Sequence, residues 1–405
     1  MNKLLAECGF DDAVEAACRP YYDACGGRDS IAPGVYFRML FIGYFEAIDS
    51  QRGIAWRCAD SLSLREFLGV KLTERTPDHS TLSKTRDRLP IEVHELAFRL
   101  VLAAAAERGL LKGKTLGVDS TTLEADAAMR SIVRKGSGED WKAYVKRLMQ
   151  EAGQIEEGDE PSDEDLRRFD KRRKNKKVSN TEWESPTDPD ARTAKLKNGR
   201  TRLAYKAEHA LDLETEPIVA AEVYHADHSD SQTLADTAMA ARTHLAEAGH
   251  EEVFREVVAD KGYHAAGQLE LAQSLGLRTY VPEPNRRHRL RWNNKPIELK
   301  EAIYANRRRT KTEKNSKLQR LRSERVERSF AHVCDTGGAR RTRLRGIEKV
   351  RKRTLIVAAA HNLAILMRRL LGAGKPKALA AILDQLALAL PLLIRLIETR
   401  KSTGC

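Results

Sequence analysis

Apolar residues recur at helical spacing through the first quarter of the chain. Residues Ala32 to Ile48 and Leu96 to Leu111 both carry hydrophobic side chains three and four positions apart, a period that predicts amphipathic helices. We therefore expect an all-α N-terminal domain over residues 1–110.

A third helix is predicted between these two, in the segment R-T-P-D-H-S-T-L-S-K-T-R-D-R-L that begins at Arg75. Pro77 ends the preceding segment, and Asp78 or Ser80 can cap the new helix. The helix would project hydroxyl and basic side chains, which suit contacts with phosphates and with a DNA groove. These candidate DNA-binding residues are Ser83, Lys84, Arg86 and Arg88.

From Lys114 the pattern changes to short β-branched runs, which predict strands. The expected strands are Lys114–Leu123, Leu203–Leu213, Pro217–Tyr224, Phe254–Ala259 and Arg278–Val281. Helices are expected at Ser231–Ala248 and Ala265–Leu275. Three strands followed by helix, strand, helix and strand indicate an α/β domain with a mixed sheet. We place this domain at residues 111–371 and a C-terminal helical tail at 372–405.

A charged segment interrupts the predicted core between its first two strands. Glu151 to Leu166 holds eight acidic residues and no basic one, and Arg167 to Val178 holds eight basic residues and one acid. Opposite charge blocks this close can fold onto each other or stay mobile. We interpret residues 130–200 as a poorly packed insertion, either a gate over a DNA channel or a solvated excursion with no role.

The net charge of +13 and the pI near 9.4 favour a polyanionic partner, and nucleic acid is the commonest one. Aromatic residues make up only 6% of the 405 residues, which argues against a protein that binds single strands by base stacking. The basic residues cluster in two stretches, 285–322 and 339–353. Candidate DNA contacts there are Arg286, Arg287, Arg307, Arg308, Arg309, Arg340, Arg341, Arg343 and Arg345.

The six cysteines form no Cys-x-x-Cys pair and no zinc-finger spacing, so free thiols in a reducing compartment are expected. The first ten residues lack the continuous apolar core of a signal peptide. The longest apolar run, Leu386 to Ile397, is about half of the ~20 residues that a membrane-spanning helix needs. We expect a soluble cytoplasmic protein associated with the nucleoid, without a membrane partner.

Three acidic residues occupy positions that suit a metal-dependent nuclease. Asp119 lies inside the first strand, where an ionised carboxylate is unfavourable unless it is paired or liganded. Asp260 ends the fourth strand, and Glu327 lies on a helix predicted from Ser316 to Val333. Other acids near the predicted strands remain alternatives: Glu124, Asp126, Asp212, Asp227 and Asp230.

Helical geometry favours Glu327 over Glu324 as the third acid. Val326, Phe330 and Val333 define the apolar stripe of this helix. At 100° per residue, Glu327 lies roughly 90° from the centre of the stripe and Glu324 roughly 150° away. Glu327 thus borders the core, whereas Glu324 points to solvent.

Three carboxylates suit Mg²⁺, with Mn²⁺ as a substitute, because these hard ions prefer oxygen ligands and keep open positions for phosphate oxygens. Two such ions can activate an oxygen nucleophile and stabilise the leaving oxygen of a phosphoryl displacement. We expect two ions per site, with Asp119 bridging them and with Asp260 and Glu327 each completing one shell.

These segments resemble bacterial insertion-sequence transposases of the DDE type, whose catalytic domain is similar to ribonuclease H and retroviral integrases. The resemblance rests on G-V-D-S-T-T, A-D-K-G-Y and R-V-E-R-S-F in this order. It extends to T-P-D-H-S-T-L-S-K-T-R in the N-terminal region, D-P-D-A-R and Y-K-A-E-H-A-L-D in the middle, and R-L-R-G-I-E-K-V near the end. It implies a ribonuclease H-like fold with Asp119, Asp260 and Glu327 as the metal-binding triad.

The resemblance also implies a role in DNA binding or dimerisation for the N-terminal domain at residues 1–110, and an activity for the whole chain. It implies binding to terminal inverted repeats of double-stranded DNA, cleavage at the element ends and attack of the freed 3′-hydroxyl on target DNA, by a homodimer or larger assembly. Related transposases often carry a basic residue seven positions after the catalytic Glu, where this chain has Cys334. That phosphate contact would be lost here or supplied by Arg340 or Arg341. The alternatives are a Mg²⁺-dependent nuclease that does not join strands and an inactive DNA-binding repressor copy.

Overall fold

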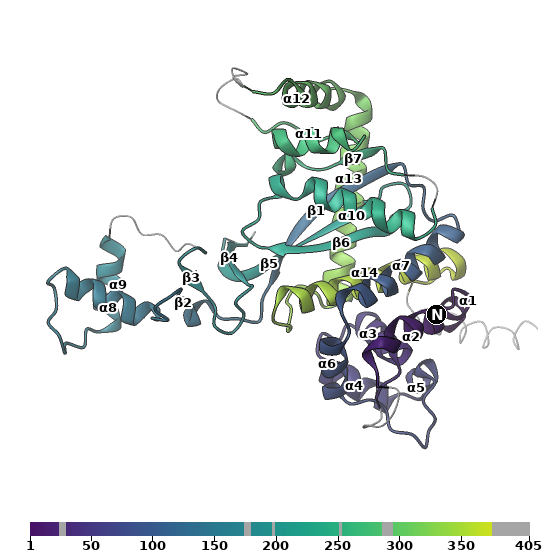
Figure 1. Ribbon diagram of the computed structural model, residues 1–405, viewed down its shortest axis with the longest axis horizontal. Helices are drawn as coiled ribbons and strands as arrows, with labels where there is room; N and C mark the ends of the chain where they lie inside the picture. Colours follow the sequence, from purple (N-terminus) through teal and green to yellow (C-terminus); the bar gives the residue numbers. More distant parts are fainter. Residues whose placement is uncertain (24–29, 174–179, 197–198, 251–252, 286–294, 375–405) are drawn as a thin grey trace, which may run out of the picture.

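The computed structural model describes most of the chain (Figure 1), namely residues 1–23, 30–173, 180–196, 199–250, 253–285 and 295–374. The predicted C-terminal tail from 375 on, together with Arg286 and Arg287, lies outside the described residues. Mixed α/β architecture is confirmed: a helical N-terminal region precedes a single large mixed sheet with helices around it.

The N-terminal region is helical, as predicted. Its α-helices are α1 (Asn2–Glu7), α2 (Phe10–Cys18), α3 (Pro33–Phe45), α4 (Gln51–Asp60), α5 (Leu62–Leu68), α6 (His79–Arg88) and α7 (Ile91–Glu107). Asp78 caps α6, because its Oδ1 accepts a hydrogen bond from the Ser80 backbone N–H at 2.8 Å. Helix α3 is apolar nearly all round and lies at the centre of this region, packed against α2, α4 and α5.

The large sheet holds β1 (Thr115–Glu124), β4 (Arg192–Lys195), β5 (Thr201–Asp212), β6 (Ile218–His225), β7 (Glu256–Val258) and β8 (Arg278–Tyr280). Strand β1 lies in the middle, antiparallel to β5 on one side and parallel to β7 on the other. Strand β6 pairs with β5, and β8 extends the parallel half beyond β7. The expected mixed sheet is therefore confirmed, with each predicted strand in it.

Two helices contact opposite faces of the sheet. Helix α13 (Glu313–Ala331) contacts His209 of β5, while α10 (Leu234–Glu247) contacts the preceding residue, Glu208. Successive strand residues point to opposite faces, so the two helices cover the two sides. Helices α11 (Ala266–Ser274) and α12 (Ile297–Thr310) pack beside β8. At its C-terminal end α13 continues as a π-helix, His332–Thr336.

Helix α14 (Ile347–Leu371) joins the sheet to the N-terminal helices. It packs against β6 and also against α3 and α7, and the Asn362 amide binds both the N–H and the C=O of Ile218 on the open edge of β6. The helix thereby covers a strand edge that would otherwise be unpaired. By length and composition α14 could cross a membrane, but 67% of its most apolar window is buried, as in the core helix of a soluble protein.

Two sequence segments that lie far apart meet at the start of α14. Asp188 accepts hydrogen bonds from the Gly346 N–H at 3.1 Å and from the Tyr205 hydroxyl at 2.7 and 2.8 Å. Asp190 accepts one from the Ile347 N–H at 3.0 Å. Both carboxylates therefore satisfy backbone donors at the positive end of the helix. The D-P-D-A-R segment thus caps the helix that begins in R-L-R-G-I-E-K-V.

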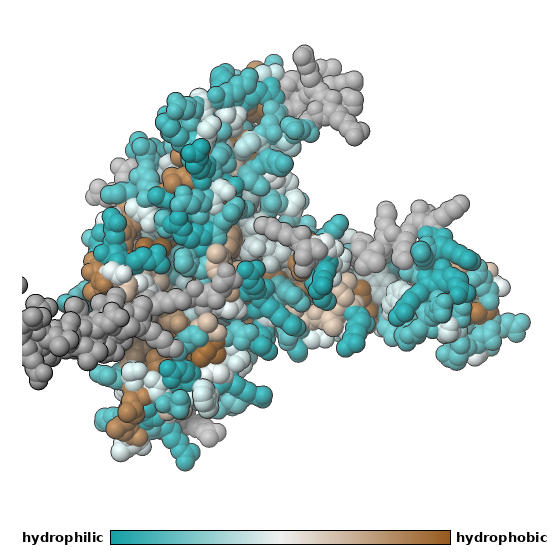
Figure 2. All heavy atoms as spheres, turned by 180° about the vertical axis from the view of Figure 1, so that it is seen from behind, coloured by the Kyte–Doolittle hydropathy of each residue, from teal (hydrophilic) through white to brown (hydrophobic). Residues whose placement is uncertain are grey.

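The charged insertion was expected to be poorly packed, and this expectation is wrong for its central part. Helices α8 (Trp141–Glu151) and α9 (Asp163–Arg172) form a lobe around a small apolar core of their own, beside the two-stranded pair β2 (Val133–Arg134) and β3 (Trp183–Glu184). The strong amphipathic period of both helices was hidden by the density of charges. The lobe projects from the sheet and its surface is mainly hydrophilic (Figures 1 and 2).

Candidate active site

Asp119 lies inside β1, and Asp260 follows the end of the neighbouring parallel strand β7 by two residues. The last pair in the ladder between these strands is Gly117 with Val258, and Asp119 and Asp260 each stand two residues further along the chain. Asp260 caps the short 3₁₀ turn that follows β7, where its Oδ1 accepts the Gly262 N–H at 2.7 Å.

Arg322 of α13 holds Asp119 from the adjacent helix. Its Nη1 lies 2.7 Å from Asp119 Oδ2, while Asp119 Oδ1 accepts the Ser120 N–H at 2.8 Å. Burial raises the pKa of Asp119 above its usual value; Arg322 opposes that rise, and the negative charge of Asp260 adds to it. Asp119 and Asp260 therefore form an electrostatically coupled pair of carboxylates that favours a cation between them.

Glu327 also belongs to α13, and its side chain is exposed. Gln319, Ser323 and Glu327 are spaced four residues apart, so they form one row on the helix. This row begins beside Asp260, because Gln319 binds the carbonyl oxygen of Ala259 at 3.1 Å. The Glu327 Oε1 accepts the Ser323 hydroxyl at 2.8 Å.

Glu324, also exposed, belongs to another side of the helix. It pairs with Arg328, and Arg328 pairs with Glu216 in the turn between β5 and β6. The two glutamates thus have different partners, but both side chains are exposed. Their catalytic roles stay a prediction.

The oxygen donors at Asp119 and Asp260 fit a hard divalent ion, because carboxylate oxygens are its preferred ligands and the two like charges need a countercharge. Arg322 supplies one positive charge to the pair in the structure. Within the described part of the chain, no three His, Cys, Asp or Glu side chains come together as a complete metal site.

A polar network that the sequence analysis missed lies on the opposite face of the sheet, directly behind Asp119. Lys206 Nζ lies 3.0 Å from Glu208 Oε2 and 2.9 Å from Asp230 Oδ1, and Ser120 donates its hydroxyl to the same Asp230 oxygen at 2.7 Å. Glu208 is fully buried and also accepts the Tyr263 hydroxyl at 2.8 Å. Alternating polar residues in Y-K-A-E-H-A, a strand that is otherwise apolar, were the signal available for it.

This network packs closely against the turn that contains Asp260. A side chain on Gly262 would meet Asp260 Oδ1 at 3.0 Å and Asp230 Oδ2 at 3.1 Å, so the backbone there lies close to both carboxylates. Burial and the neighbouring Glu208 raise the pKa of Tyr263, which keeps its hydroxyl a donor. The chain around Asp260 is therefore held from the α10 side of the sheet.

The alternative acids have other partners. Asp212 accepts the N–H groups of Lys112 and Gly113 at 2.6 and 2.9 Å, which makes it part of a turn. The remaining ion pairs are Glu124 with Arg202, Asp126 with Arg341 and Arg345, and Asp227 with Arg192. Of these alternatives, Asp230 is the one in the network behind Asp119.

The predicted DNA-binding face of α6 requires one correction. Lys84 and Arg88 are exposed and Ser83 is partly exposed, whereas Arg86 is only 5% exposed and points into the protein. The apolar stripe of α6 runs through Leu82 and Leu89, and Arg86 lies on that inner side. Arg86 is therefore not part of the outer face.

The other candidate DNA-binding arginines also fall into two groups, those that bind other parts of the protein and those that are exposed. Arg307 forms a double hydrogen bond with Glu283, and Arg309 binds the backbone and side chain of Thr279, so both are engaged in the fold. Arg308 is exposed. The other exposed members of the set are Arg340, Arg341, Arg343 and Arg345. Cys334 lines a small apolar cavity with His209 and Phe330.

Comparisons with known families agree with this architecture. The family described as "Transposase DDE domain" matches residues 140–363, and the family described as "Transposase domain (DUF772)" matches residues 5–88. The first match includes Asp260 and Glu327, whereas Asp119 precedes it. No curated protein and no solved structure gives a match.

The DDE match covers more than half of the chain. Proteins of this family act on DNA in transposition and recombination and generally use divalent metal ions. The mixed sheet described above is consistent with the ribonuclease H-like fold of their catalytic domain. The chain therefore belongs to the DDE-domain transposases.

Proposed function

We propose that this transposase binds the terminal inverted repeats of its own element, cleaves DNA strands at the element ends and joins the freed 3′-hydroxyl to target DNA. Asp119, Asp260 and Glu327 would hold two Mg²⁺ ions, with Mn²⁺ as a substitute. The observation that carries the proposal is the pair of carboxylates formed by Asp119 on β1 and Asp260 just after β7, beside a helix that bears a third one. When bound, the two ions activate the attacking oxygen and stabilise the leaving oxygen.

The chain's own residues have three tasks in this scheme. Arg322 fixes the orientation of Asp119 and offsets its charge when no metal is bound. The Lys206, Glu208 and Asp230 network holds the backbone behind Asp119 and Asp260, so that the pair keeps its spacing. Glu327 would then complete the site from α13, by a movement of its exposed side chain.

Exposed basic residues would contact the DNA backbone. Lys84 and Arg88 lie on α6, and Arg341 and Arg345 lie on the segment before α14. Arg341 and Arg345 both pair with Asp126, so DNA would compete with a carboxylate for them. We also propose a homodimer or larger assembly on paired element ends, because joining two ends requires two active sites.

An excision and insertion assay in cells tests the proposal. The gene is supplied beside a marker flanked by the element's own ends, as wild type, Glu327→Gln and Glu324→Gln. We expect joined insertions from wild type and from Glu324→Gln, the matched control on the same helix, and none from Glu327→Gln.

Other outcomes of this assay contradict the proposal in distinct ways. Broken ends without joined products would identify a nuclease. Binding of the ends without cleavage by the purified protein in Mn²⁺ would identify a repressor copy. Equal activity of the Glu327→Gln variant would remove this residue from the site.

A further inference from the structure

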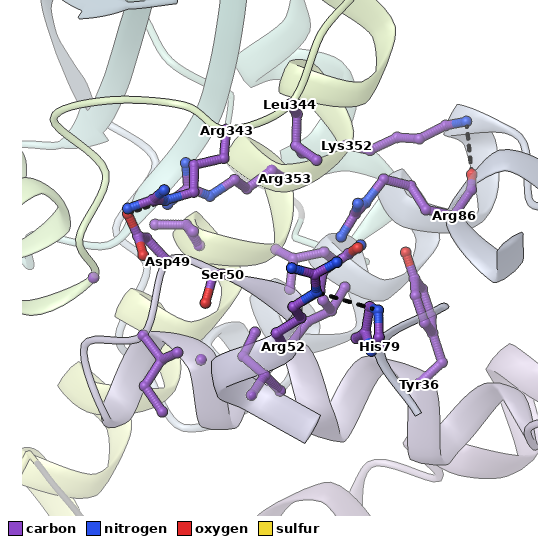
Figure 3. A pocket seen from close by; sticks show the side chains of 18 of the residues that line it. Tyr36, Asp49, Ser50, Arg52, His79, Arg86, Arg343, Leu344, Lys352 and Arg353 are labelled. Atoms are coloured by element: carbon purple, nitrogen blue, oxygen red, sulfur yellow. Dashed lines mark hydrogen bonds and ion pairs between the residues drawn. The ribbon is translucent and has the colours of Figure 1, made fainter. Parts of the chain in front are cut away.

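A cavity of about 270 Å³ lies between the N-terminal helices and α14, away from the candidate active site. Its walls come from α3, α4, α6 and α7 on one side and from α14 with the segment before it on the other. Apolar side chains such as Leu40, Ile54 and Ile356 line part of it. Figure 3 shows basic side chains from several of these elements around the same space.

The charge of this cavity is strongly one-sided. Five basic side chains line it, against the single acid Asp49, and they are Arg52, Arg86, Arg343, Lys352 and Arg353. Asp49 is engaged by Arg343 at 2.9 Å, and Lys352 is paired at 2.6 Å with Glu348. The carboxylates close to the cavity are therefore already used by two of the five cations.

Two of the remaining cations, the buried Arg86 and the partly exposed Arg353, form no ion pair with a carboxylate among the described residues. Arg86 donates to the Gln51 amide oxygen, with one nitrogen at 2.7 Å, in the orientation of that amide that satisfies both groups. Arg353 donates to the backbone carbonyls of Arg341 and Gly338, each at 3.2 Å. Desolvation lowers the pKa of Arg353, and the nearby Asp49 opposes that change only in part. A guanidinium keeps its proton at ordinary pH, and an anion compensates its charge better than the neutral oxygens that these two arginines bind.

The geometry points to a phosphate-binding site: we propose that a phosphate group occupies this cavity between Arg86, Arg353 and Arg52. Guanidinium groups bind phosphate oxygens through paired N–H donors, which suits a tetrahedral oxyanion approached from several elements. Arg52 already contacts His79 Nε2 at 3.4 Å at the rim, and both side chains can turn toward such a ligand. The phosphate would connect α4 and α6 to α14 and so fix the N-terminal helices on the catalytic domain.

Two sources could supply the group, a phosphate of the DNA backbone or free inorganic phosphate. The first rests on the proposed function, because a backbone phosphate would reach the cavity only from DNA bound at the exposed residues Lys84 and Arg88 of α6. The site itself is independent of transposition, because binding of inorganic phosphate needs neither DNA nor a divalent metal.

Calorimetric titration of the full chain with inorganic phosphate, at constant ionic strength and without divalent metal, tests the site. We expect saturable binding by wild type and at least tenfold weaker binding by Arg86→Gln. Arg75→Gln, an exposed change of the same charge just before α6, should leave the affinity within twofold. Absence of binding by wild type, or equal binding by Arg86→Gln, would overturn the proposal. Should Arg86→Gln fail to fold by circular dichroism, Arg52→Gln replaces it, with at least a threefold loss expected and an unchanged affinity counting against the site.

A second titration distinguishes the two sources. If DNA supplies the phosphate, a saturating inverted-repeat duplex abolishes binding of inorganic phosphate, and Arg86→Gln weakens duplex binding more than Arg88→Gln does. If the source is free phosphate, the protein–DNA complex still binds it with unchanged affinity. Inactivity in the excision assay together with intact phosphate binding would remove the proposed function and leave the phosphate site standing.

Discussion

Replacing Arg322 by Met removes the partner of Asp119 while keeping the volume of the side chain nearly constant. Arg322 is almost buried and the Asp119 side chain is 22% exposed. Without Arg322, the Asp119 carboxylate would stay in a poorly solvated place beside Asp260, with the Ser120 N–H as its described hydrogen-bond donor. The variant therefore isolates the cost of an unpaired carboxylate.

The expected loss follows from what remains at the site. Removing one partner of a buried ion pair typically costs about 3–5 kcal/mol. Because Asp119 keeps some exposure and one hydrogen bond, we expect the free energy of unfolding to fall by about 2–3 kcal/mol at neutral pH.

The loss should also depend on pH. Removing Arg322 raises the pKa of Asp119 further, and a carboxyl with a raised folded-state pKa destabilises the fold only at pH values where it is ionised. The loss should therefore shrink as the pH falls through that pKa, to below about 1 kcal/mol near pH 4.

Urea unfolding followed by circular dichroism in the presence of a chelator measures this difference for wild type, Arg322→Met and Arg320→Met. Arg320 is exposed on the same helix and serves as the control, with an expected change within about 0.5 kcal/mol. A loss for Arg322→Met that is the same at neutral and acidic pH would show that lost packing, and not an unpaired carboxylate, is responsible. The reasoning about the Asp119 and Asp260 pair would then be refuted.

Three further predictions concern activity, DNA binding and the cap of α14. With purified protein and Mn²⁺, Glu327→Gln should reduce strand cleavage by at least 100-fold and Glu324→Gln by less than threefold, and equal losses would contradict the assignment by helix face. For about five phosphate contacts, duplex affinity should fall on the order of 10²–10³-fold between about 50 and 200 mM salt, whereas a flat titration would exclude the exposed basic residues as the footprint. Tyr205→Phe should cost about 1–3 kcal/mol in urea unfolding, because buried Asp188 loses its side-chain donor. Tyr44→Phe, whose hydroxyl lies 3.4 Å from His361, should cost clearly less, and the reverse order would refute the capping role.

Periodicity was sufficient to predict five of the six strands of the large sheet and the helices α10, α11 and α13, whereas β4 and α12 were not predicted. The strands around Asp119 and Asp260 have short β-branched runs ended by turn residues, and these signals are local. The register that brings the two carboxylates level is not local, because it depends on how β7 returns to β1 after more than a hundred residues. The sequence could therefore identify Asp119 and Asp260 as candidate metal ligands, but it could not show that they are neighbours.

Two features were out of reach for physical reasons. Arginine on a short polar helix is usually exposed to solvent. Arg86 is buried because α14, which lies far away in the sequence, packs near it. The core of the insertion lobe, Val145, Met149 and Leu166, is too small to stand out among so many charges. In both cases tertiary contacts determine whether the side chains are buried, and composition alone predicts exposure instead.

The position of α14 has a consequence for synthesis of the protein. The helix is the last described element, yet it covers α3 and α7 from the first 107 residues and closes the edge of β6. During translation, the apolar faces of α3 and α7 therefore stay uncovered until α14, which begins at Ile347, has left the ribosome. A copy of the gene with a stop codon before residue 347 would yield a chain that lacks α14 and leaves its N-terminal helices uncovered. Such a fragment is expected to aggregate or be degraded, so partial genes would not produce a stable DNA-binding inhibitor.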